Sequence, residues 1–529
     1  MPVWFIHTGY ILEAILVMNR PKITLKHSRI EIADYNPGDS SYLEYLFSHF
    51  DPIRHQRYPK CIEYDNVSKT LILPRGIAIS TLKRAFKAEP FVDMNCDAYV
   101  DTPPLVIKYM VKDDRQEAIL RFLVGMPPYE FTLSKSQLAV NSTTGSGKTF
   151  VTVAAMCVQG SRIVIITSSI NWLNQWKEKI LEYTLLDPSQ IYMITGRSSI
   201  EKLFVRDTFL NYQVFLASHS TLQSFAVNNP KGWYAVDELF QKLQCSTKIF
   251  DEAHLYLDNM AHIDYHSNVK KTIYLTATPA RSDKEENAIY QTYFQNIPSI
   301  SLFDENTDPH VNYIGMLFYS HPNPHQVQAF STGQFKFDRH IYTDYLVNNP
   351  NFLNLVLVIV DMCLRINGKV LMYIGKNSAI AQIRDHIIAN FPFLANCIGI
   401  YNSEITDKSI RRQMLMKKFI LSTTKSCGAA SDIDDLAVTV VLAEPFHSAV
   451  IAQQTLGRCR KPDTLYIDCI DLSVYRTRQY YKDKQPIFMR FAKSCQEMMM
   501  SDELIARESE RIRLFYGARQ MMTLPVFSK

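Results

Sequence analysis

The stretch Asn141-Ser-Thr-Thr-Gly-Ser-Gly-Lys-Thr-Phe150 has the composition of a phosphate-binding loop. The apolar run before it, Ser136–Val140, predicts a buried strand, and Lys148–Val158 predicts a helix that stops at Gly160. In a strand–loop–helix unit, backbone N–H groups at the glycines can turn onto a polyphosphate at the helix N-terminus. The alternative is a plain Gly/Ser/Thr turn, since the strict pattern wants glycine where Ser142 stands.

The residues of this loop have separate expected roles. Lys148 can reach the terminal phosphates of a nucleotide, and the Thr149 hydroxyl can hold Mg²⁺. The remaining residues of the nucleotide cradle are Thr144, Gly145, Ser146 and Gly147. The loop by itself predicts a bound nucleotide but no particular reaction, because a kinase or a GTPase would use it equally.

Length and composition indicate a globular protein with several domains. The 529 residues, 47% of them hydrophobic, allow three or four units of ~150 residues, each with its own core. The net charge of +5 is mildly basic, which suits a nucleic-acid partner without requiring one. No run approaches the ~20 apolar residues of a membrane span, so we expect no membrane partner.

The cysteines and the first residues bear on the cellular compartment. Ten cysteines are scattered without a Cys-x-x-Cys pair, which argues against a zinc ribbon, an iron–sulfur cluster or a disulfide framework. We therefore expect a reducing compartment, the cytoplasm, or the host cytoplasm if the protein is viral. The apolar opening Met1–Met18 lacks a basic region and a cleavage site, so we expect no signal peptide. We expect instead that Met18 is the biological start and that residues 1–17 are an extension.

The pattern along the chain divides it into blocks. Residues 18–103 read as short strands with a helix, a small α/β region that ends at Asp101-Thr-Pro-Pro104. After this boundary, apolar strand runs alternate with helices, which indicates parallel strands joined by crossovers. The polar region 301–348 is expected to be a linker or insertion, followed by a second alternating block, 349–485. The tail 486–529 is expected to be helical.

Two adjacent acids end a predicted strand about 100 residues after the loop. Nucleotide hydrolysis needs one carboxylate to hold magnesium and a second to orient and deprotonate the attacking water. Asp251 is the expected magnesium residue and Glu252 the expected general base. An isolated Asp-Glu pair is more often a solvated loop, but the apolar strand before it and the loop upstream favour the catalytic interpretation.

Four short motifs follow one another in order: Thr144-Gly-Ser-Gly-Lys-Thr149, Asp251-Glu-Ala-His254, Thr276-Ala-Thr278 and Gln454-Thr-Leu-Gly-Arg458-Cys-Arg460-Lys461. Together they resemble the signature of superfamily 2 helicases of the DEAH type, in which the glycine replaced by Ser142 is commonly absent. The resemblance implies an α/β fold of two tandem RecA-like parallel-sheet lobes, with ATP and Mg²⁺ bound between them. The implied layout is an accessory α/β domain 18–103, an ATP-binding lobe 104–300, a linker 301–348, a second lobe 349–485 and a helical tail 486–529.

The resemblance assigns roles in the first lobe. His254 matches the residue that couples the acidic motif to Thr276 and Thr278, which link hydrolysis to movement on nucleic acid. Gln116 matches an adenine-reading residue, although Arg-Gln on an amphipathic helix is common. Two segments match contacts to the nucleic-acid backbone, for which hydroxyls are suited: Thr167, Ser168, Leu173, Gln175 and Trp176 in one, Ser218 and Thr221 in the other. A helix cap is a nearly equal alternative for both segments.

In the second lobe, Thr423 matches a nucleic-acid contact and Asp432 a contact to the nucleotide sugar. Gln454, Arg458 and Arg460 match the motif whose arginine reaches the γ-phosphate. The usual pattern is Gln-x-x-Gly-Arg-x-x-Arg, and here lysine holds the last position with Arg460 one residue earlier, so either arginine can be the finger. Lysine is a poor substitute for a planar guanidinium. The segment Tyr475–Lys484 interleaves bases with aromatics, as a single-strand platform or a surface helix would.

These resemblances imply an ATP hydrolase that acts as a helicase or translocase, with DNA favoured over RNA as its partner. The arrangement of blocks, together with Leu73-Pro-Arg-Gly76, is similar to phage and large-virus helicases of the UvsW type, which remodel branched DNA in replication, recombination or repair. An RNA helicase remains an alternative. So does a clamp that uses ATP only to gate its attachment to nucleic acid.

Overall fold

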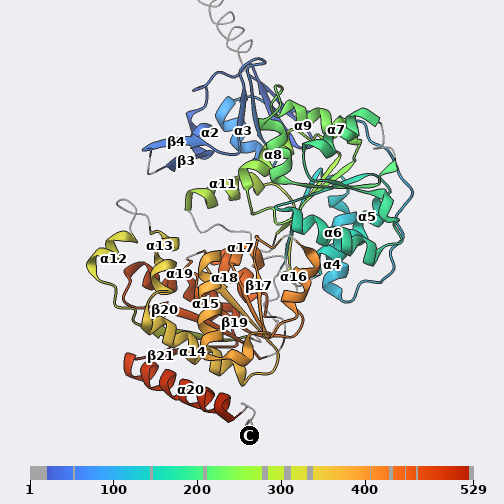
Figure 1. The fold of residues 1–529 in the computed structure, drawn as a ribbon. Coiled ribbons are helices and arrows are strands. Elements are labelled where there is room, and N and C mark those ends of the chain that lie inside the picture. The colour runs from blue at the N-terminus through green and yellow to red at the C-terminus, as the bar shows by residue number, and fades with distance from the viewer. Residues whose placement is uncertain are drawn as a thin grey trace, which may run out of the picture. The chain divides into compact units, whose positions relative to one another are not determined.

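The computed structural model describes residues 21–51, 54–142, 147–206, 211–276, 284–302, 311–330, 337–405, 407–427, 433–446, 448–459, 461 and 463–522. The chain divides into two compact units, Met1–Phe303 and Asp304–Lys529. Each is built around a seven-stranded sheet (Figure 1). The predicted loop residues 144–146, together with Thr278, Asp432 and Arg460, lie outside the described residues.

The N-terminal part of the first unit is a small, mainly antiparallel sheet in the order β5-β6-β2-β1-β7. Its strands alternate buried and partly exposed side chains, as expected for a sheet with one covered face. A separate hairpin, β3–β4, lies next to helix α11, whose Glu285 accepts from the Phe50 N–H at 2.8 Å. The elements are β1 (Lys22–Leu25), β2 (Arg29–Ala33), α2 (Ser41–Leu46), β3 (Ser48–Asp51), β4 (Gln56–Pro59), β5 (Glu63–Asp65), β6 (Thr70–Pro74), α3 (Ile79–Phe86) and β7 (Phe91–Val92).

The large sheet of the first unit is parallel throughout, in the order β10-β11-β9-β12-β13-β8-β14. Its central strands are continuous apolar runs because both faces are covered. The elements are α4 (Asp114–Val124), β8 (Gln137–Ser142), α5 (Lys148–Gln159), β9 (Ile163–Thr167), α6 (Ile170–Tyr183), β10 (Ile191–Ile194), α7 (Arg197–Arg206), β11 (Val214–Ser218), α8 (His219–Val227), α9 (Tyr234–Leu243), β12 (Thr247–Phe250), α10 (Leu257–Tyr265), β13 (Lys271–Thr276), α11 (Lys284–Phe294) and β14 (Ser299–Leu302).

Two hydrophobic cores lie on the two faces of this sheet. Helices α4, α5 and α6 pack on one face, and α7 to α11 pack on the other together with the N-terminal region. This second core runs without a break from Ile23 and Leu73 to Phe215 and Tyr274. The small α/β region that the sequence separates at residue 103 is therefore part of the first compact unit.

The second unit contains another all-parallel sheet, in the order β17-β18-β16-β19-β20-β15-β21. Helices α13, α14, α15 and α20 cover one face, and α18 and α19 cover the other. The elements are β15 (Val311–Phe318), α12 (Pro324–Ala329), α13 (Arg339–Leu346), α14 (Pro350–Leu364), β16 (Lys369–Ile374), α15 (Asn377–Asn390), β17 (Ile398–Tyr401), α16 (Lys408–Leu415), β18 (Phe419–Ser422), α17 (Thr424–Cys427), β19 (Leu436–Ala443), α18 (Ala449–Leu456), β20 (Thr464–Asp471), α19 (Tyr475–Phe491), β21 (Ser494–Met499) and α20 (Asp502–Met522).

The two sheets confirm the predicted tandem parallel-sheet fold, with two local differences from the sequence pattern. The region expected to be a linker supplies β15, which pairs along its whole length with β20 and is almost fully buried. Its Asn312 and Gly315 interrupt the apolar run that would have marked it as a strand. Helix α19 continues through Pro486, and the tail adds strand β21 before α20.

No single helix among the described ranges is long and apolar enough to cross a membrane. The bent pair α13 and α14 passes that test by length and composition only. Most apolar side chains of α14 lie in the core against the second sheet. The apolar character of this pair therefore reflects packing inside the unit.

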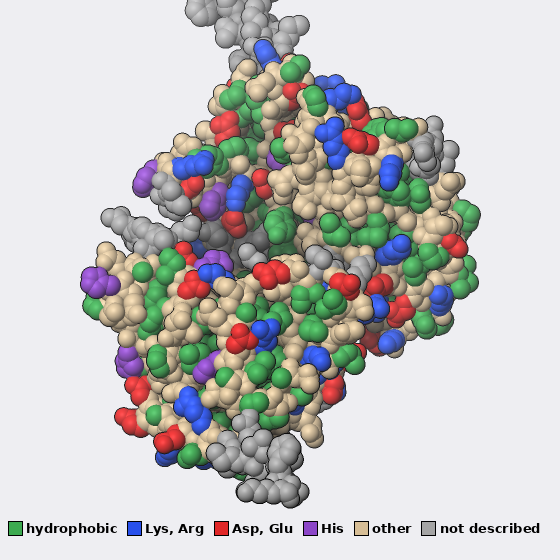
Figure 2. Space-filling model, in the orientation of Figure 1, with side chains coloured by type: hydrophobic (Ala, Val, Ile, Leu, Met, Phe, Trp, Pro, Cys, Tyr) green, Lys and Arg blue, Asp and Glu red, His purple; other side chains and the backbone are tan. Residues whose placement is uncertain are grey.

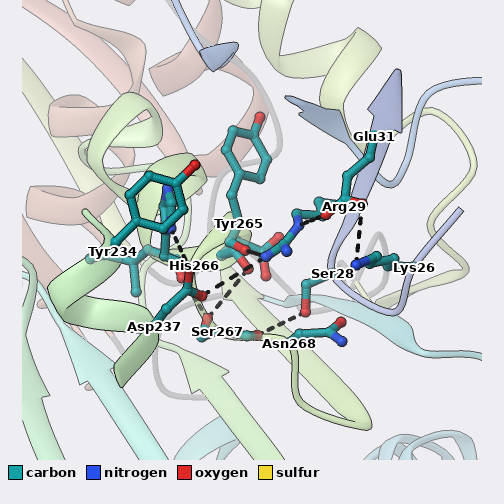
Figure 3. Close-up of polar contacts among 12 residues, drawn as sticks. Lys26, Ser28, Arg29, Glu31, Tyr234, Asp237, Tyr265, His266, Ser267 and Asn268 are labelled. Atoms are coloured by element: carbon teal, nitrogen blue, oxygen red, sulfur yellow. Dashed lines mark hydrogen bonds and ion pairs between the residues drawn. The ribbon is translucent and has the colours of Figure 1, made fainter. Parts of the chain in front are cut away.

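Figure 3 shows how the N-terminal region is joined to the end of α10 and the turn after it. The Arg29 guanidinium donates to the Tyr265 carbonyl, and the Ser28 hydroxyl donates to the Ser267 carbonyl at 2.9 Å. Ser28 also accepts from the ammonium of Lys248, a fully buried charge in the middle of β12. These bonds join the N-terminal region to the chain segment that connects the acidic motif to β13.

A second group of contacts at this junction is centred on His266, which is almost fully buried. Its Nδ1 lies 3.0 Å from Asp237 and its Nε2 lies 3.0 Å from Glu63 of β5. Glu63 also meets His262 at 2.9 Å, and the Arg29 guanidinium lies 4.0 Å from Asp237. Burial alone would lower the pKa of His266, but the two carboxylates raise it to about 9.

The raised pKa of His266 predicts that stability of the first unit falls at alkaline pH. The stabilisation is fully present below the ordinary histidine pKa of 6.5 and is lost as pH rises through about 9. This difference in pKa corresponds to about 3 kcal/mol. Thermal unfolding between pH 6.5 and 9 should therefore show a falling midpoint, and Glu63→Gln should flatten that fall.

Glu63 itself titrates outside this window. Burial raises the pKa of Glu63, but the hydrogen bonds of His262 and His266 lower it to about 2. Its contribution to the stability of the first unit is therefore present above pH 4.5 and is lost only as pH falls through about 2. Glu285→Gln is the control, because it removes a half-exposed ion pair with Arg57. The prediction fails if wild type and Glu63→Gln have the same pH dependence.

Candidate functional site

The strand register of the first sheet brings most predicted first-lobe site residues to one edge. Thr276, at the end of β13, pairs with Asn141 of β8, the strand that leads into the phosphate loop. Phe250 pairs with Ile166, so that Asp251 follows β12 at the same level as Thr167. Ser218 in turn pairs with Thr167. Because all these strands are parallel, their carboxyl ends form one row, where α/β sheets bind ligands.

Of the predicted phosphate loop after Ser142, the structure describes Gly147 at the start of α5. Gly147, the residue before α5, has φ +84°, which side chains rarely tolerate. A Cβ at Gly147 would lie 2.5 Å from Nε2 of Gln116, so the end of that side chain would have to shift. The Oε1 of Gln116 accepts from the Lys112 N–H at 2.9 Å. Gln116 therefore lies directly beside Gly147.

Lys148 is partly buried in the first turn of α5, and its ammonium donates to the Ser142 carbonyl. Burial lowers its pKa, while the negative charges of Glu252 and Asp251 act in the opposite direction. The lysine thus lies within the field of both acids. Thr149 follows it in the same helical turn and is partly exposed.

The acidic motif is held by its neighbours from several elements. The Asp251 N–H donates to Ile166 of β9 at 2.9 Å, and Nε1 of Trp176 donates to Oδ2 of Asp251 at 2.8 Å. Burial raises the pKa of Asp251, against the effects of the Trp176 N–H and of Lys148. Glu252 has φ +51°, an unusual backbone conformation for a non-glycine residue, of the kind that often marks functional sites.

His254 joins the acidic motif to β13. It is fully buried, with Nδ1 2.8 Å from Oγ1 of Thr276 and 3.2 Å from Oε2 of Glu252. The contact with Thr276 is a hydrogen bond whose direction depends on the His254 tautomer, and the contact with Glu252 is a close approach of the same nitrogen to a carboxylate oxygen. The acidic motif and the end of β13 thus meet at one imidazole.

The oxygen donors present at this edge fit a magnesium ion. The Asp251 carboxylate and the Thr149 hydroxyl are hard oxygen ligands, which Mg²⁺ prefers. Asp251 carries one donor on each carboxylate oxygen, from Trp176 and from the Glu252 N–H at 3.1 Å, in the manner of an oriented metal ligand. The described residues therefore suit the predicted cofactor set of a nucleotide with magnesium.

The predicted nucleic-acid contacts of the first sheet differ in exposure. Thr167 and Ser218 are fully buried. The Thr167 hydroxyl donates to Ser169 at 2.9 Å, and the Ser218 oxygen accepts from the Thr221 N–H at 3.2 Å as the N-cap of α8. Ser218 therefore caps a helix, which is the alternative to a nucleic-acid contact. Ser168 and Gln175 are partly exposed, which leaves them as the more accessible candidates.

In the second unit, Thr423 caps the short helix α17, since its oxygen accepts from the Ser426 N–H at 3.1 Å. Glu444, after β19, accepts from the Thr424 N–H at 2.8 Å and from its hydroxyl. Arg458 is buried near the Tyr373 phenol, whose pKa burial raises and Arg458 lowers. The side chain of Gln454 lies outside the described residues. Glu444 is a contact that sequence reasoning missed, because no local pattern pairs it with Thr424.

The charge on the surface shown in Figure 2 does not mark out a nucleic-acid-binding face. On the face shown in Figure 2, acidic and basic side chains are interspersed over both units. That face carries no continuous basic stripe among the described residues, so the net charge of +5 is not concentrated there.

Comparison with known proteins agrees with this geometry. Residues 108–281 match the family model for the res subunit of type III restriction enzymes. The chain is 29% identical over 147 residues to the DNA 3'-5' helicase XPB of Mycobacterium tuberculosis, a match covering 28% of this chain and 24% of that protein. These matches support a superfamily 2 helicase core. The chain is also 25% identical over 332 residues to transcript termination protein A18 of Yaba-like disease virus, covering 60% of this chain and 63% of that protein.

Solved structures support the fold. A variant of Dbp5 from S. cerevisiae, bound to RNA and ADP BeF3, matches with a TM-score of 0.50 at 12% identity, covering 77% of this chain and 94% of that chain. T4 UvsW matches with a TM-score of 0.34 at 13% identity, covering 90% and 100%. The UvsW value is too low to carry the narrower resemblance, which stays a prediction. The matched segments span less than two thirds of the curated relatives' own length.

Proposed function

We propose that this protein is a DEAH-type, ATP-dependent DNA helicase or translocase. One observation carries the proposal: Lys148, the segment Asp251–His254 and Thr276 meet on one sheet edge, with both acids within the field of the lysine. Nucleotide hydrolysis needs this combination of a phosphate-binding lysine and paired carboxylates. The relatives named as DNA 3'-5' helicases support DNA as the substrate and 3'-to-5' as the direction of movement.

In this proposal each residue has a distinct task. Lys148 binds the terminal phosphates, and Asp251 and Thr149 would hold Mg²⁺, which when bound neutralises charge on the phosphoryl oxygens. Glu252 orients and deprotonates the attacking water. His254 lies against the Glu252 carboxylate and, through the same nitrogen, hydrogen-bonds Thr276. A change at Glu252 during hydrolysis is thus transmitted to the end of β13.

The finer proposal is a remodeller of duplex or branched DNA that acts in the cytoplasm, or in the host cytoplasm if viral, as UvsW-type helicases do. Opening one base-pair step costs on average ~1.4 kcal/mol in stacking, which one nucleotide cycle can supply. Strand displacement distinguishes this motor from an ATP-gated clamp. A clamp would hydrolyse ATP on nucleic acid without displacing or moving along any strand.

Stimulated ATPase measurements with matched ligands test the substrate. We expect duplex, forked or four-way DNA to stimulate hydrolysis more than RNA of the same sequence, with strand displacement on at least one DNA ligand. Stronger stimulation and displacement with RNA would replace the DNA proposal by the RNA helicase alternative. Hydrolysis that no nucleic acid stimulates would reject both.

Salt dependence is a second expected outcome. If Ser168, Gln175 and Thr423 bind the backbone together with basic side chains, the affinity for DNA should fall by ~10³- to 10⁵-fold between 50 and 200 mM salt for about 6 to 10 phosphate contacts. Fluorescence anisotropy of labelled DNA across this salt range measures it. A flat response would show that phosphate contacts do not dominate binding.

A further inference from the structure

Among the described residues, the indole of Trp176 is the side chain that donates a hydrogen bond to Asp251, and it comes from a distant part of the chain. Trp176 lies on α6, is 3% exposed, and its Nε1 is 2.8 Å from Oδ2 of Asp251. The sequence resemblance places Trp176 in a segment that contacts nucleic acid. The structure instead directs its polar atom to the acidic motif.

An indole is well suited to hold a carboxylate in one orientation. It donates but cannot accept, and its rigid ring is locked in the core among α6 and the sheet. The other oxygen of Asp251 accepts from the Glu252 N–H at 3.1 Å. The carboxylate is therefore held at both oxygens, with one bond from its own strand and one from α6. Hydrogen bonds of this type orient metal ligands.

Helix α6 also connects this donor to the candidate nucleic-acid contacts. The helix begins at Ile170, directly after Thr167 and Ser168, and the Thr167 hydroxyl donates to the Ser169 carbonyl at its first turn. Trp176 lies in the second turn of the same helix. A displacement of the helix start by a bound strand would move the indole and, with it, Oδ2 of Asp251.

We propose that Trp176 is a positioning residue that sets the orientation of the Asp251 carboxylate for magnesium and couples it to the nucleic-acid contacts at the start of α6. This inference rests on the proposed function, which supplies the magnesium nucleotide and the nucleic acid. Its distinguishing consequence is that loss of the indole N–H affects magnesium-dependent nucleotide binding more than nucleotide binding itself.

Trp176→Phe tests this, because phenylalanine keeps an aromatic ring but has no N–H. The readout is the equilibrium affinity for a fluorescent ADP, measured over a range of Mg²⁺ and in EDTA, with and without single-stranded DNA. We expect the Mg²⁺ concentration that gives half of the Mg²⁺-dependent change in ADP affinity to rise by about 10- to 100-fold. The affinity in EDTA should stay unchanged, and DNA should no longer alter the Mg²⁺ requirement.

Trp172→Phe is the matched control, since Trp172 lies one turn earlier on α6 and is not fully buried; it should behave as wild type. If Trp176→Phe does not fold, benzothienylalanine at position 176 replaces the indole N–H by sulfur at nearly the same volume. The inference is overturned if the ADP affinity depends on Mg²⁺ equally in wild type and variant. It is also overturned if the variant loses the same ADP affinity with and without Mg²⁺. Failure of wild type to bind or hydrolyse magnesium ATP would instead reject the proposed function.

Discussion

Replacing Glu252 by glutamine is expected to lower nucleic-acid-stimulated ATP hydrolysis by about 10²- to 10⁴-fold, the range for loss of a general base. The glutamine amide cannot take a proton from water, yet it has the shape needed to meet Nδ1 of His254, which Glu252 contacts at 3.2 Å. Nucleotide binding should therefore persist. Steady-state hydrolysis and fluorescent-nucleotide binding, measured on the same preparation, check both statements.

Lys148→Ala should have a different profile. It removes the partly buried cation that interacts with Asp251 and Glu252, so nucleotide affinity and hydrolysis should fall together, the latter by about 10²- to 10³-fold. The matched controls are Lys231→Ala and Glu238→Gln, which break an exposed ion pair in the same unit. If stimulated hydrolysis survives in both Lys148→Ala and Glu252→Gln, the assignment of the catalytic edge is wrong.

Comparing Arg458→Ala with Arg460→Ala is expected to show one loss of about 10³- to 10⁵-fold at saturating ATP and one much smaller loss. The larger loss identifies the residue that contacts the γ-phosphate. Arg458 is only 5% exposed. Its removal can therefore also disturb packing near Tyr373, and thermal unfolding of each variant must be measured beside its hydrolysis rate.

Two further variants sharpen this comparison. Arg458→Lys keeps the charge but not the planar guanidinium, so it should remain impaired if Arg458 is the finger. Lys461→Ala is the control, because Lys461 forms an exposed ion pair with Asp435 and should be dispensable for hydrolysis. Equal and mild losses for Arg458→Ala and Arg460→Ala would count against both arginines.

Much of the fold follows from local patterns. The stop of α5 at Gly160, with φ +57°, was predictable because glycine is the residue that most readily ends a helix in this conformation. The apolar runs of β9 and β12 were predictable because parallel strands are covered on both faces. Strand β15 was not, since Asn312 and Gly315 break its apolar pattern and only pairing with β20 and β21 makes it a strand.

The sequence by itself determined the order of the chemical groups: the phosphate loop, the acids at 251 and 252, Thr276 and the arginine-containing motif. This order can be read locally, because the first three motifs follow the apolar strands β8, β12 and β13 and the last begins in helix α18. Tertiary structure alone decided which side chains meet. Trp176 reaches Asp251 across 75 residues, His254 bridges Glu252 and Thr276, and Glu63 contacts His266 across 203 residues. Such contacts depend on strand order and register, which no single segment of the chain encodes.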